Sequence, residues 1–380
     1  MTPFSFMTAT EIAFGRGSSL TAADRIRAMA GGGRVLLVHG ADGRRADWLA
    51  AVLDAPLRLA VPGEPDLPLI RSATETARAA GVVAVVALGG GSAIDAGKAI
   101  AALIPATRPI TDHLEVVGAG LPLDRPPLPF VAIPTTAGTG AEVTRNAVIT
   151  VPDHRRKVSL RDPAMLPRLA IVDPALTDGC PRGVTLASGL DAVTQVIEPF
   201  CCTRANPLTD ALCRDAIPRG LAALIRLMQV QDDTRARDEL AWVSLCGGLA
   251  LANSGLGAVH GLAGPLGGLT GAAHGAICGA LLAPVLTANR AGVTDPALAA
   301  RLDQVGAWIA AAFGLPAEIG LTQAAAHLAQ WARAQGLPPL RLDQATRRAA
   351  ADAAAASSSM RANPAALDAD ALERIMAAAG

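Results

Sequence analysis

The pattern of the 380-residue chain changes near residue 180, and this change constrains the fold more than any other feature. Before it, short apolar runs rich in β-branched residues alternate with segments of helical periodicity. After it, only helical periodicity continues. Strands that alternate with helices are typical of a parallel α/β sheet, and a long series of helices is typical of an all-α domain. We therefore expect an α/β domain over residues 1–180 and a helical domain over residues 181–380.

The first domain is expected to hold a Rossmann-like parallel sheet. Runs that are apolar on both faces are typical of buried parallel strands. Such runs lie at residues 34–39, 57–61, 82–88, 130–133 and 169–172. Helical periodicity falls between them at residues 46–53 and 70–80. Residues 146–151 and 157–160, separated by a Pro-Asp-His-Arg turn, are typical of a β-hairpin.

The second domain is expected to contain helices only. Helical spacing is found at residues 187–200, 207–227, 234–253, 296–313, 322–335 and 343–355. Asp295 before Pro296 is an N-cap followed by a first-turn proline, and Asp343 can cap its own helix. The last helix is expected to begin after Asp368 or Asp370, because acidic side chains suit a helix N-terminus.

A stretch of 49 residues from Ala241 to Asn289 contains no Asp, Glu, Lys or Arg. Its length alone would allow two membrane crossings. However, eleven glycines, together with Pro265 and Pro284, divide it into short pieces. A membrane helix needs about 20 continuous apolar residues. We therefore expect this stretch to form a buried helical core.

The charge balance narrows the classes of function. The 33 basic and 33 acidic side chains give a net charge of zero, which argues against nucleic-acid and polybasic membrane-surface binders. With 51% hydrophobic residues, the chain has enough apolar surface to fold. The N-terminal residues show no basic start followed by an apolar run, so no signal peptide is expected. The six cysteines form no CxxC pair and suggest buried thiols in a reducing cytoplasm.

Two loops at strand ends predict a nucleotide site. The strand at 82–88 leads into Gly89-Gly90-Gly91-Ser92 and then into a helix with Asp95 and Lys98. Glycines let a diphosphate approach the backbone, and a helix N-terminus offers free N–H groups. The strand at 130–133 ends in Pro134-Thr135-Thr136-Ala137-Gly138-Thr139-Gly140. Each loop alone is also compatible with an ordinary structural turn, but two of them at the carboxyl ends of one parallel sheet favour a nucleotide crevice.

The helical half offers candidate metal ligands. Asp191 and Gln195 are four residues apart and share one helix face. His260 and His274 lie within the uncharged stretch. A carboxylate and two imidazoles can bind a divalent metal ion. The alternative is that both histidines are hydrogen-bonded core residues.

Four motifs in order resemble those of the iron-containing (group III) alcohol dehydrogenases. They are GGGSxxDxxK, PTTAGTGxE, GLDAxTxxIEPF and GLGAVHGxAxPLG followed by HG, and the resemblance extends from Phe14-Gly15 to Asn363-Pro364. That family includes maleylacetate reductases and relatives of glycerol dehydrogenase, and dehydroquinate synthase shares its fold. The resemblance implies a dinucleotide-binding domain, a helical domain and an active site in the cleft between them.

The resemblance also implies roles for individual residues. NAD or NADP would be bound by Gly40, Gly89, Gly90, Gly91, Ser92, Asp95, Lys98, Thr135, Thr136, Thr139, Val143 and Leu176. Family members bind their metal through an Asp, a His four residues later and two His fourteen residues apart. The matching positions here are Asp191, Gln195, His260 and His274. Asp191, His260 and His274 would also be the catalytic residues.

Three departures from the family pattern affect these expectations. Gln195 replaces an imidazole by an amide, so affinity for Fe²⁺ or Zn²⁺ should fall and oxygen-preferring ions should gain. Gly264 stands where many members have a proton-transferring His, so a proton relay must use water or a substrate group. The first strand ends in Val38-His39-Gly40 instead of an Asp, and Arg44 and Arg45 lie just beyond it, which makes NADPH at least as well suited as NADH. The alternative is that the two arginines only lie at a solvated helix start.

We therefore expect an NAD(P)-dependent oxidoreductase that transfers a hydride between nicotinamide and a small alcohol or carbonyl substrate. Metal assistance is expected, and the chain should be a cytoplasmic homodimer without a nucleic-acid or membrane partner. Three alternatives stay open: a metal-independent reductase similar to maleylacetate reductases, a lyase similar to dehydroquinate synthase, and a nucleotide-binding paralogue without catalysis. The identity of the substrate leaves no mark in the sequence.

Overall fold

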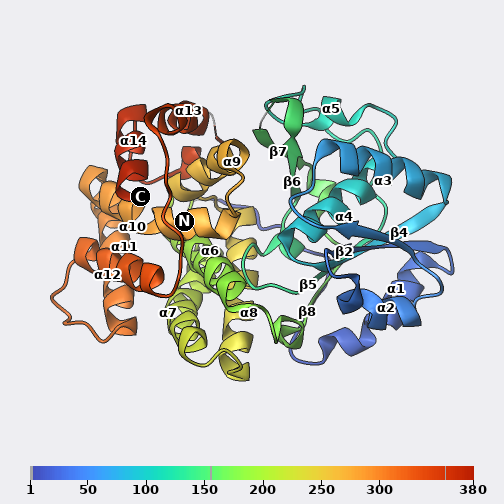
Figure 1. Cartoon of the computed structure of the whole chain (residues 1–380), viewed down its shortest axis with the longest axis horizontal. Coiled ribbons are helices and arrows are strands. Elements are labelled where there is room, and N and C mark those ends of the chain that lie inside the picture. Colours follow the sequence, from blue (N-terminus) through green and yellow to red (C-terminus); the bar gives the residue numbers. More distant parts are fainter. Residues whose placement is uncertain (1–2, 155, 356) are drawn as a thin grey trace. The chain divides into compact units, whose positions relative to one another are not determined.

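A six-stranded parallel sheet forms the centre of the α/β half, which confirms the fold predicted for it (Figure 1). The structure is a computed structural model that describes residues 3–154, 156–355 and 357–380. The sheet has the order β1-β8-β5-β4-β2-β3. Its strands are β1 (Ile12–Phe14), β2 (Arg34–Gly40), β3 (Leu57–Val61), β4 (Val82–Gly89), β5 (Phe130–Pro134) and β8 (Leu169–Val172). Only β1, a three-residue strand at the sheet edge, was not predicted.

Helices cover both faces of this sheet (Figure 1). On one face, α1 (Ala22–Ala30) and α2 (Asp47–Val52) pack against alternate residues of the strands. On the other face, α3 (Leu67–Ala79) and α4 (Gly91–Leu103) pack against the remaining ones. The helix that follows β2 therefore covers one face of the sheet, and the helix that precedes β4 covers the other. This change of direction between β2 and β4 is the switch point at which open α/β sheets bind their ligands.

The predicted hairpin is present and packs on α4. It consists of β6 (Asn146–Val151) and β7 (Arg156–Arg161), which pair antiparallel. The predicted turn includes residue 155, which lies outside the described residues. The backbone N–H of Val148 donates to Oδ2 of Asp95 on α4 at 3.1 Å, so the hairpin is fastened to the helix that follows the glycine-rich loop.

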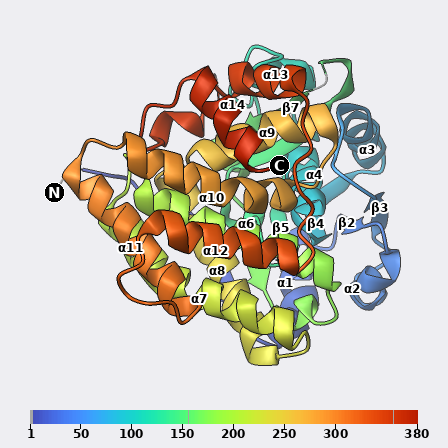
Figure 2. The ribbon, with the colours of Figure 1, turned by 60° about the vertical axis from the view of Figure 1, so that its left-hand side comes forward.

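The second half is helical, as predicted. Its helices are α6 (Arg182–Cys201), α7 (Pro207–Gln229), α8 (Thr234–Asn253), α9 (Ala258–Thr270), α10 (His274–Gly292), α11 (Pro296–Ala312), α12 (Leu321–Ala334), α13 (Gln344–Ala355) and α14 (Ala369–Ala378). The predicted caps form, because Asp295 accepts from Ala297 N and Asp368 accepts from Ala371 N. Helix α10 packs against α6, α9, α12 and α14 and lies at the centre of this half (Figure 2).

The described chain divides into two compact units. One comprises Thr8–Thr136 and Gly140–Asp178, and the other comprises residues 3–7, Ala137–Thr139 and Gly179–Gly380. The sequence placed the boundary at residue 180 and contains no signal that residues 3–7 and 137–139 belong with the helices.

The uncharged stretch forms the end of α8 and the buried helices α9 and α10. Among the described residues, no single helix is long and apolar enough to cross a membrane. In the part of the chain that the structure describes, only α8 and α9 taken together reach that length and hydropathy, and they bend by 97° at their junction.

Candidate metal and active site

Three predicted metal ligands converge within the helical unit. Asp191 lies on α6, His260 lies on α9, and His274 is the first residue of α10. Oδ1 of Asp191 is 3.4 Å from Nε2 of His260 and 3.7 Å from Nε2 of His274. The sequence motifs therefore bring together a carboxylate and two imidazoles that come from three different helices.

The buried carboxylate of Asp191 has the environment of a cation ligand. Its side chain is buried, and among the described residues its Oδ1 atom has no hydrogen-bond partner. A buried carboxylate oxygen without a partner costs free energy, so such an atom calls for an explanation. A positive ion between Asp191 and the two imidazoles would satisfy it.

The carboxylate of Asp191 and the imidazoles of His260 and His274 each favour the charged form of the other. Burial opposes ionisation of Asp191, but the two neighbouring imidazoles outweigh it and lower the pKa of the carboxyl group. Burial likewise opposes charging of His274, but Cys278 and Asp191 raise its pKa to about 9. The pKa of His260 is raised well above its ordinary value, because Cys278, Glu198 and Asp191 outweigh the burial of its ring. A metal ion must therefore displace protons from these rings when it binds.

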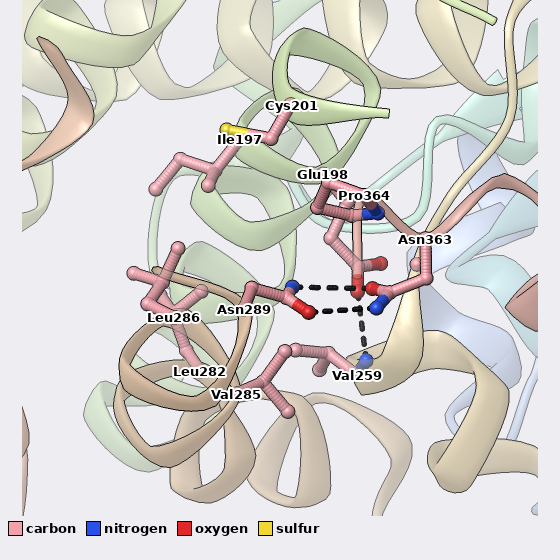
Figure 3. Close-up of a pocket in the computed structure, with 11 residues that line it drawn as sticks. Ile197, Glu198, Cys201, Val259, Leu282, Val285, Leu286, Asn289, Asn363 and Pro364 are labelled. Atoms are coloured by element: carbon pink, nitrogen blue, oxygen red, sulfur yellow. Dashed lines mark hydrogen bonds between the residues drawn. The ribbon is translucent and has the colours of Figure 1, made fainter. Parts of the chain in front are cut away.

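Glu198 orients the first of the two imidazoles. Its Oε2 atom lies 2.6 Å from Nδ1 of His260. Its Oε1 atom accepts the backbone N–H of Val259 at 2.7 Å, as Figure 3 shows. With Nδ1–H donating to the carboxylate, Nε2 is left to face Asp191. A carboxylate behind a ligating histidine sets the tautomer and the orientation of the ring. The motif GLDAxTxxIEPF contains Glu198, but the sequence analysis assigned it no role.

A pair of asparagines holds the start of α9. Nδ2 of Asn289 donates to Oδ1 of Asn363 at 3.1 Å, and Nδ2 of Asn363 donates to Oδ1 of Asn289 at 2.6 Å (Figure 3). The same Oδ1 of Asn363 accepts the backbone N–H of Ala258 at 3.0 Å. Together with the Glu198 contact to Val259, these bonds satisfy free N–H groups of the first turn of α9. They hold His260 in position from the backbone side.

Cys278 lies within the site, which the sequence analysis missed. Its Sγ atom is 3.6 Å from Nε2 of His274 and 4.0 Å from Nε2 of His260. Four donor atoms, one each from Asp191, His260, His274 and Cys278, lie within 4.8 Å of one another. The signal was present, because Cys278 follows His274 by four residues and the two share one face of α10.

The amide nitrogen of Gln195, the fourth predicted ligand, forms a hydrogen bond with the backbone of another segment. Its side chain is 2% exposed, and Nε2 donates to the backbone carbonyl of Thr139 at 2.6 Å. Gly264 occupies the position at which many family members have a proton-transferring histidine. It lies in α9, and a Cβ atom built there meets no atom within 4 Å.

The predicted nucleotide loops converge within the α/β unit. Gly89 ends β4, Gly90 caps α4, and Gly91 begins that helix. A Cβ atom on Gly89 would stand 3.3 Å from the backbone nitrogen of Gly40, and one on Gly90 would stand 3.2 Å from Oγ1 of Thr136. The carboxyl ends of β2, β4 and β5 thus meet around glycines that keep the backbone accessible.

Asp95 and Lys98 have structural partners. Lys98 is buried on α4, and its Nζ donates to Ala141 O at 2.8 Å, Thr144 Oγ1 at 2.9 Å and Asn146 O at 2.8 Å. Because burial outweighs the nearby carboxylates, the pKa of Lys98 falls to about 8. Lys98 and Asp95 therefore join α4 to the hairpin and to the turn before it.

The remaining predicted nucleotide residues are distributed over both units. Thr135 and Ser92 lie beside the glycine-rich loop, with Thr135 N donating to Gly89 O at 2.9 Å. Val143 is fully buried, and Leu176 packs at the edge of the core beneath the sheet. Thr139 belongs to the helical unit.

The arginines after β2 differ in their surroundings. Arg44 makes a two-pronged ion pair with Asp42, with Nε to Oδ1 and Nη2 to Oδ2 both at 2.9 Å. Arg45 is exposed. Both guanidinium groups were predicted to suit a phosphate, but that of Arg44 is paired with Asp42.

Both halves of the chain match known family models. Residues 9–174 match the model described as iron-containing alcohol dehydrogenase, and residues 185–380 match the model of the C-terminal part of the same family.

Three curated relatives illustrate the similarity. The 4-hydroxybutyrate dehydrogenase of Cupriavidus necator is 37% identical over 60% of this chain and 60% of its own length. Alcohol dehydrogenase 4 of Schizosaccharomyces pombe is 38% identical over 58% of this chain and 51% of its own length. The probable alcohol dehydrogenase EutG of Salmonella typhimurium is 34% identical over 72% of this chain and 71% of its own length. The match thus spans less than two thirds of the first two relatives.

Solved structures show the same fold over the whole chain. A 1,3-propanediol oxidoreductase has a TM-score of 0.85 at 26% identity and covers 100% of both chains. An iron-containing alcohol dehydrogenase has a TM-score of 0.83 at 24% identity, over 100% of this chain and 99% of its own.

Proposed function

Because the chain belongs to the iron-containing alcohol dehydrogenase family, we propose that it is an NAD(P)-dependent oxidoreductase acting on a small alcohol or carbonyl substrate. Members of this family use NAD(P) and iron. The observation that carries the proposal is the buried Oδ1 atom of Asp191, which lies without a hydrogen-bond partner between two imidazole nitrogens. The name of one relative, 4-hydroxybutyrate dehydrogenase, favours a short hydroxy acid as substrate.

The donor set fits a divalent metal ion. In a tetrahedral zinc site, bond lengths near 2.1 Å place neighbouring oxygen and nitrogen donors roughly 3.4 Å apart. The distances from Asp191 Oδ1 to the two Nε2 atoms are 3.4 and 3.7 Å. Carboxylate and imidazole are ligands that iron and zinc both accept. Asp191, His260 and His274 would hold the ion.

The residues of the chain would divide the work of the reaction. When bound, the metal ion would polarise the substrate oxygen as a Lewis acid, and the nicotinamide would carry the hydride. Glu198 would hold the proton on Nδ1 of His260, so that Nε2 is the nitrogen that faces the ion once the ion has displaced the Nε2 proton. Asp191 and His260 are buried among the apolar residues of the helices, which strengthens the field of these groups, whereas the His274 side chain is 33% exposed. Since Gly264 carries no imidazole, we propose that the proton leaves through water or a substrate hydroxyl.

Nucleotide binding is proposed for the glycine-rich loop at the switch point of the sheet. The open backbone at Gly89 to Gly91 and the N-terminus of α4 suit a pyrophosphate. Because the end of β2 lacks a carboxylate and Arg45 is exposed, we propose that NADPH is accepted as well as NADH. The position of the reaction in a cleft between the domains stays a prediction.

The test combines metal analysis with NADH and NADPH oxidation against aldehydes, ketones and maleylacetate. We expect oxidation of the nucleotide by a short aldehyde, loss of activity after chelation and recovery when metal is added. The Asp191→Ala variant should lower kcat/KM by about 100-fold or more, because the charge that holds the ion is lost. The matched control Asp232→Ala, at an exposed loop position, should leave kcat/KM unchanged.

Each contrary result identifies a different alternative. Full activity after chelation would indicate the metal-independent reductase. Substrate conversion without net change in NAD(P)H would indicate the lyase. Nucleotide binding without turnover across the panel would indicate the non-catalytic paralogue. The homodimer and the cytoplasmic location are proposed from the sequence alone, and light scattering of the purified chain tests the first of these.

A further inference from the structure

We propose that the thiolate of Cys278, and not the amide of Gln195, completes the metal site. The site would then consist of one carboxylate, two imidazoles and one thiolate, and it would prefer Zn²⁺ to Fe²⁺. This inference deepens the proposed function, because it concerns the same site and takes it to bind a divalent ion.

The distances around Cys278 suit a zinc ligand. The side chain is fully buried, and its Sγ atom lies 3.6 Å from Nε2 of His274 and 4.0 Å from Nε2 of His260. With a Zn–S bond of about 2.3 Å and a Zn–N bond of about 2.05 Å, a tetrahedral site places sulfur and nitrogen about 3.6 Å apart. The observed spacing is therefore close to that of a formed site.

The packing of α10 explains how Cys278 reaches the site. Gly275 and Gly279 directly follow His274 and Cys278 in sequence. A Cβ atom on Gly275 would stand 2.4 Å from the carbonyl oxygen of Ala187, and one on Gly279 would stand 2.6 Å from Cδ1 of Leu190. These two glycines let α10 approach α6 next to Asp191. The close approach carries both the imidazole and the thiol of α10 to the carboxylate.

Gln195 has a different task in the structure. Its Nε2 donates to Thr139 O, and a Cβ atom on Gly247 of α8 would lie 3.2 Å from the same Nε2. The neighbouring Gly138 N donates to Oγ of Ser244 at 2.8 Å. Gln195 and Ser244 thus hold residues 137–139 against the helices. This contact explains why these three residues belong to the helical unit.

Charge and ligand softness point to zinc. A divalent ion buried among apolar helices is stabilised when its ligands balance its charge, because isolated buried charges are costly. Asp191 and a Cys278 thiolate supply two negative charges, whereas a Gln195 amide supplies none. Thiolate ligands favour zinc over metals that prefer oxygen donors.

The test is a Co²⁺ titration of the full-length protein after its metal has been removed with a chelator. We expect one Co²⁺ per chain and a near-ultraviolet charge-transfer band from a thiolate bound to cobalt. In Cys278→Ser the band should disappear, and the affinity for Zn²⁺ should fall by at least about tenfold, the lower limit known for loss of an outer partner of a zinc ligand. Gln195→Ala should keep the band and the stoichiometry.

Two controls make the result specific. Cys246→Ala should keep the band, because burial raises the pKa of the Cys246 thiol to about 12 and this residue is not among the clustered donors. X-ray absorption of the zinc-loaded wild type should show one sulfur neighbour at about 2.3 Å, and this measurement does not depend on any variant folding.

A band that survives in Cys278→Ser, a site lost in Gln195→Ala, or zinc without a sulfur neighbour would each overturn the assignment. So would equal affinities for Zn²⁺ and Fe²⁺, and so would a wild type that binds no Co²⁺. None of these measurements requires substrate or nucleotide. Turnover is measured on the same preparation, so a sulfur-ligated metal without turnover would overturn the proposed function alone, and turnover with a sulfur-free metal would overturn this assignment alone.

Discussion

At the scale of single residues, the side chains behind the ligands matter as much as the ligands. Glu198 accepts from His260 Nδ1 and from Val259 N, and both of its oxygens are used. Arg44 and Arg45 are both exposed near the end of β2, but Arg44 forms an ion pair with Asp42. The first pairing orients the His260 ring, and the second makes Arg44 less available to a phosphate.

Glu198→Gln should weaken metal binding by about 10- to 100-fold, as expected for the outer partner of a ligating histidine. The new amide N–H₂ facing Nδ1 would favour the His260 tautomer with its proton on Nε2, which blocks the metal-facing nitrogen. Isothermal titration of the metal-free protein with Zn²⁺ measures the loss. Glu239→Gln, at a surface ion pair, is the control, and an unchanged affinity in Glu198→Gln would contradict the positioning role.

Arg45→Ala should raise KM for NADPH by about tenfold and leave KM for NADH unchanged, because a guanidinium–phosphate pair contributes on the order of 1.4 kcal/mol. Steady-state kinetics with both nucleotides test this. Arg34→Ala, at the opposite end of β2, should change neither value. Equal effects on both nucleotides would show that Arg45 does not recognise the 2′-phosphate.

At the scale of the elements, glycines decide how closely helices approach. Gly279 lies against Leu190 on α6, whereas Gly264 in α9 faces open space. The same residue type therefore has opposite consequences in two neighbouring helices.

Gly264→Ala should stabilise the chain by roughly 0.5–1 kcal/mol, because alanine is the better helix former and its Cβ meets no atom. Gly279→Ala should destabilise it, because the new Cβ would stand 2.6 Å from Leu190 Cδ1. Chemical denaturation of the two variants measures both changes. A loss of stability in Gly264→Ala would mean that α9 has a neighbour at this position in solution.

The buried side chains of Lys98 on α4 and of the nearby Glu142 should make the stability of the α/β unit depend on pH. Burial raises the pKa of Glu142 to about 7 from 4.5 and lowers that of Lys98 to about 8 from 10.5. Between pH 4.5 and 7 the folded chain holds the Glu142 proton that the unfolded chain loses, so stability falls as pH rises. Between pH 8 and 10.5 the unfolded chain holds the extra Lys98 proton, so stability rises with pH, and each change is on the order of 3 kcal/mol.

Urea unfolding across this pH range should therefore show a minimum near pH 7 to 8 from these two groups. Lys98→Met should remove the rise above pH 8, and Glu142→Gln should remove the fall below pH 7. Lys157→Met, which removes the other lysine of the chain, should keep both. A rise that persists in Lys98→Met would assign it to another group.

At the scale of the whole molecule, the proposed metal ligands lie in one unit and most of the proposed nucleotide residues lie in the other. The two kinds of ligand should therefore stabilise different parts of the chain. A ligand at 100 times its Kd stabilises the part that binds it by about 2.7 kcal/mol.

Hydrogen exchange should separate the two effects. Zn²⁺ should slow exchange in α6, α9 and α10, and NADP⁺ should slow it in the loop between β4 and α4. Mass spectrometry of peptic fragments measures both. Protection of the β4–α4 loop by Zn²⁺ alone would contradict this division of binding between the units.

The sequence by itself determined the features that depend on neighbours along the chain. The buried strands, the cap at Asp295 and the glycine-rich turn after β4 were predicted from local patterns, and the last helix was placed after Asp368 or Asp370. The candidate ligands Asp191, His260 and His274 were predicted from the resemblance to the family motifs. Periodicity and capping act over a few residues, so they can be read without knowing the fold.

Only the tertiary structure decided which side chains share the site. Cys278 was predicted only to be a buried thiol, yet it lies among the candidate metal donors. The amide nitrogen of Gln195 bonds to the backbone of Thr139. Lys98 bonds to the hairpin and its preceding turn, and Glu198 stands behind His260. Cys278 could have been found, because it follows His274 by four residues. The other partners are 43 to 62 residues apart in sequence, so only the packing of the chain brings them together and no local pattern reveals them.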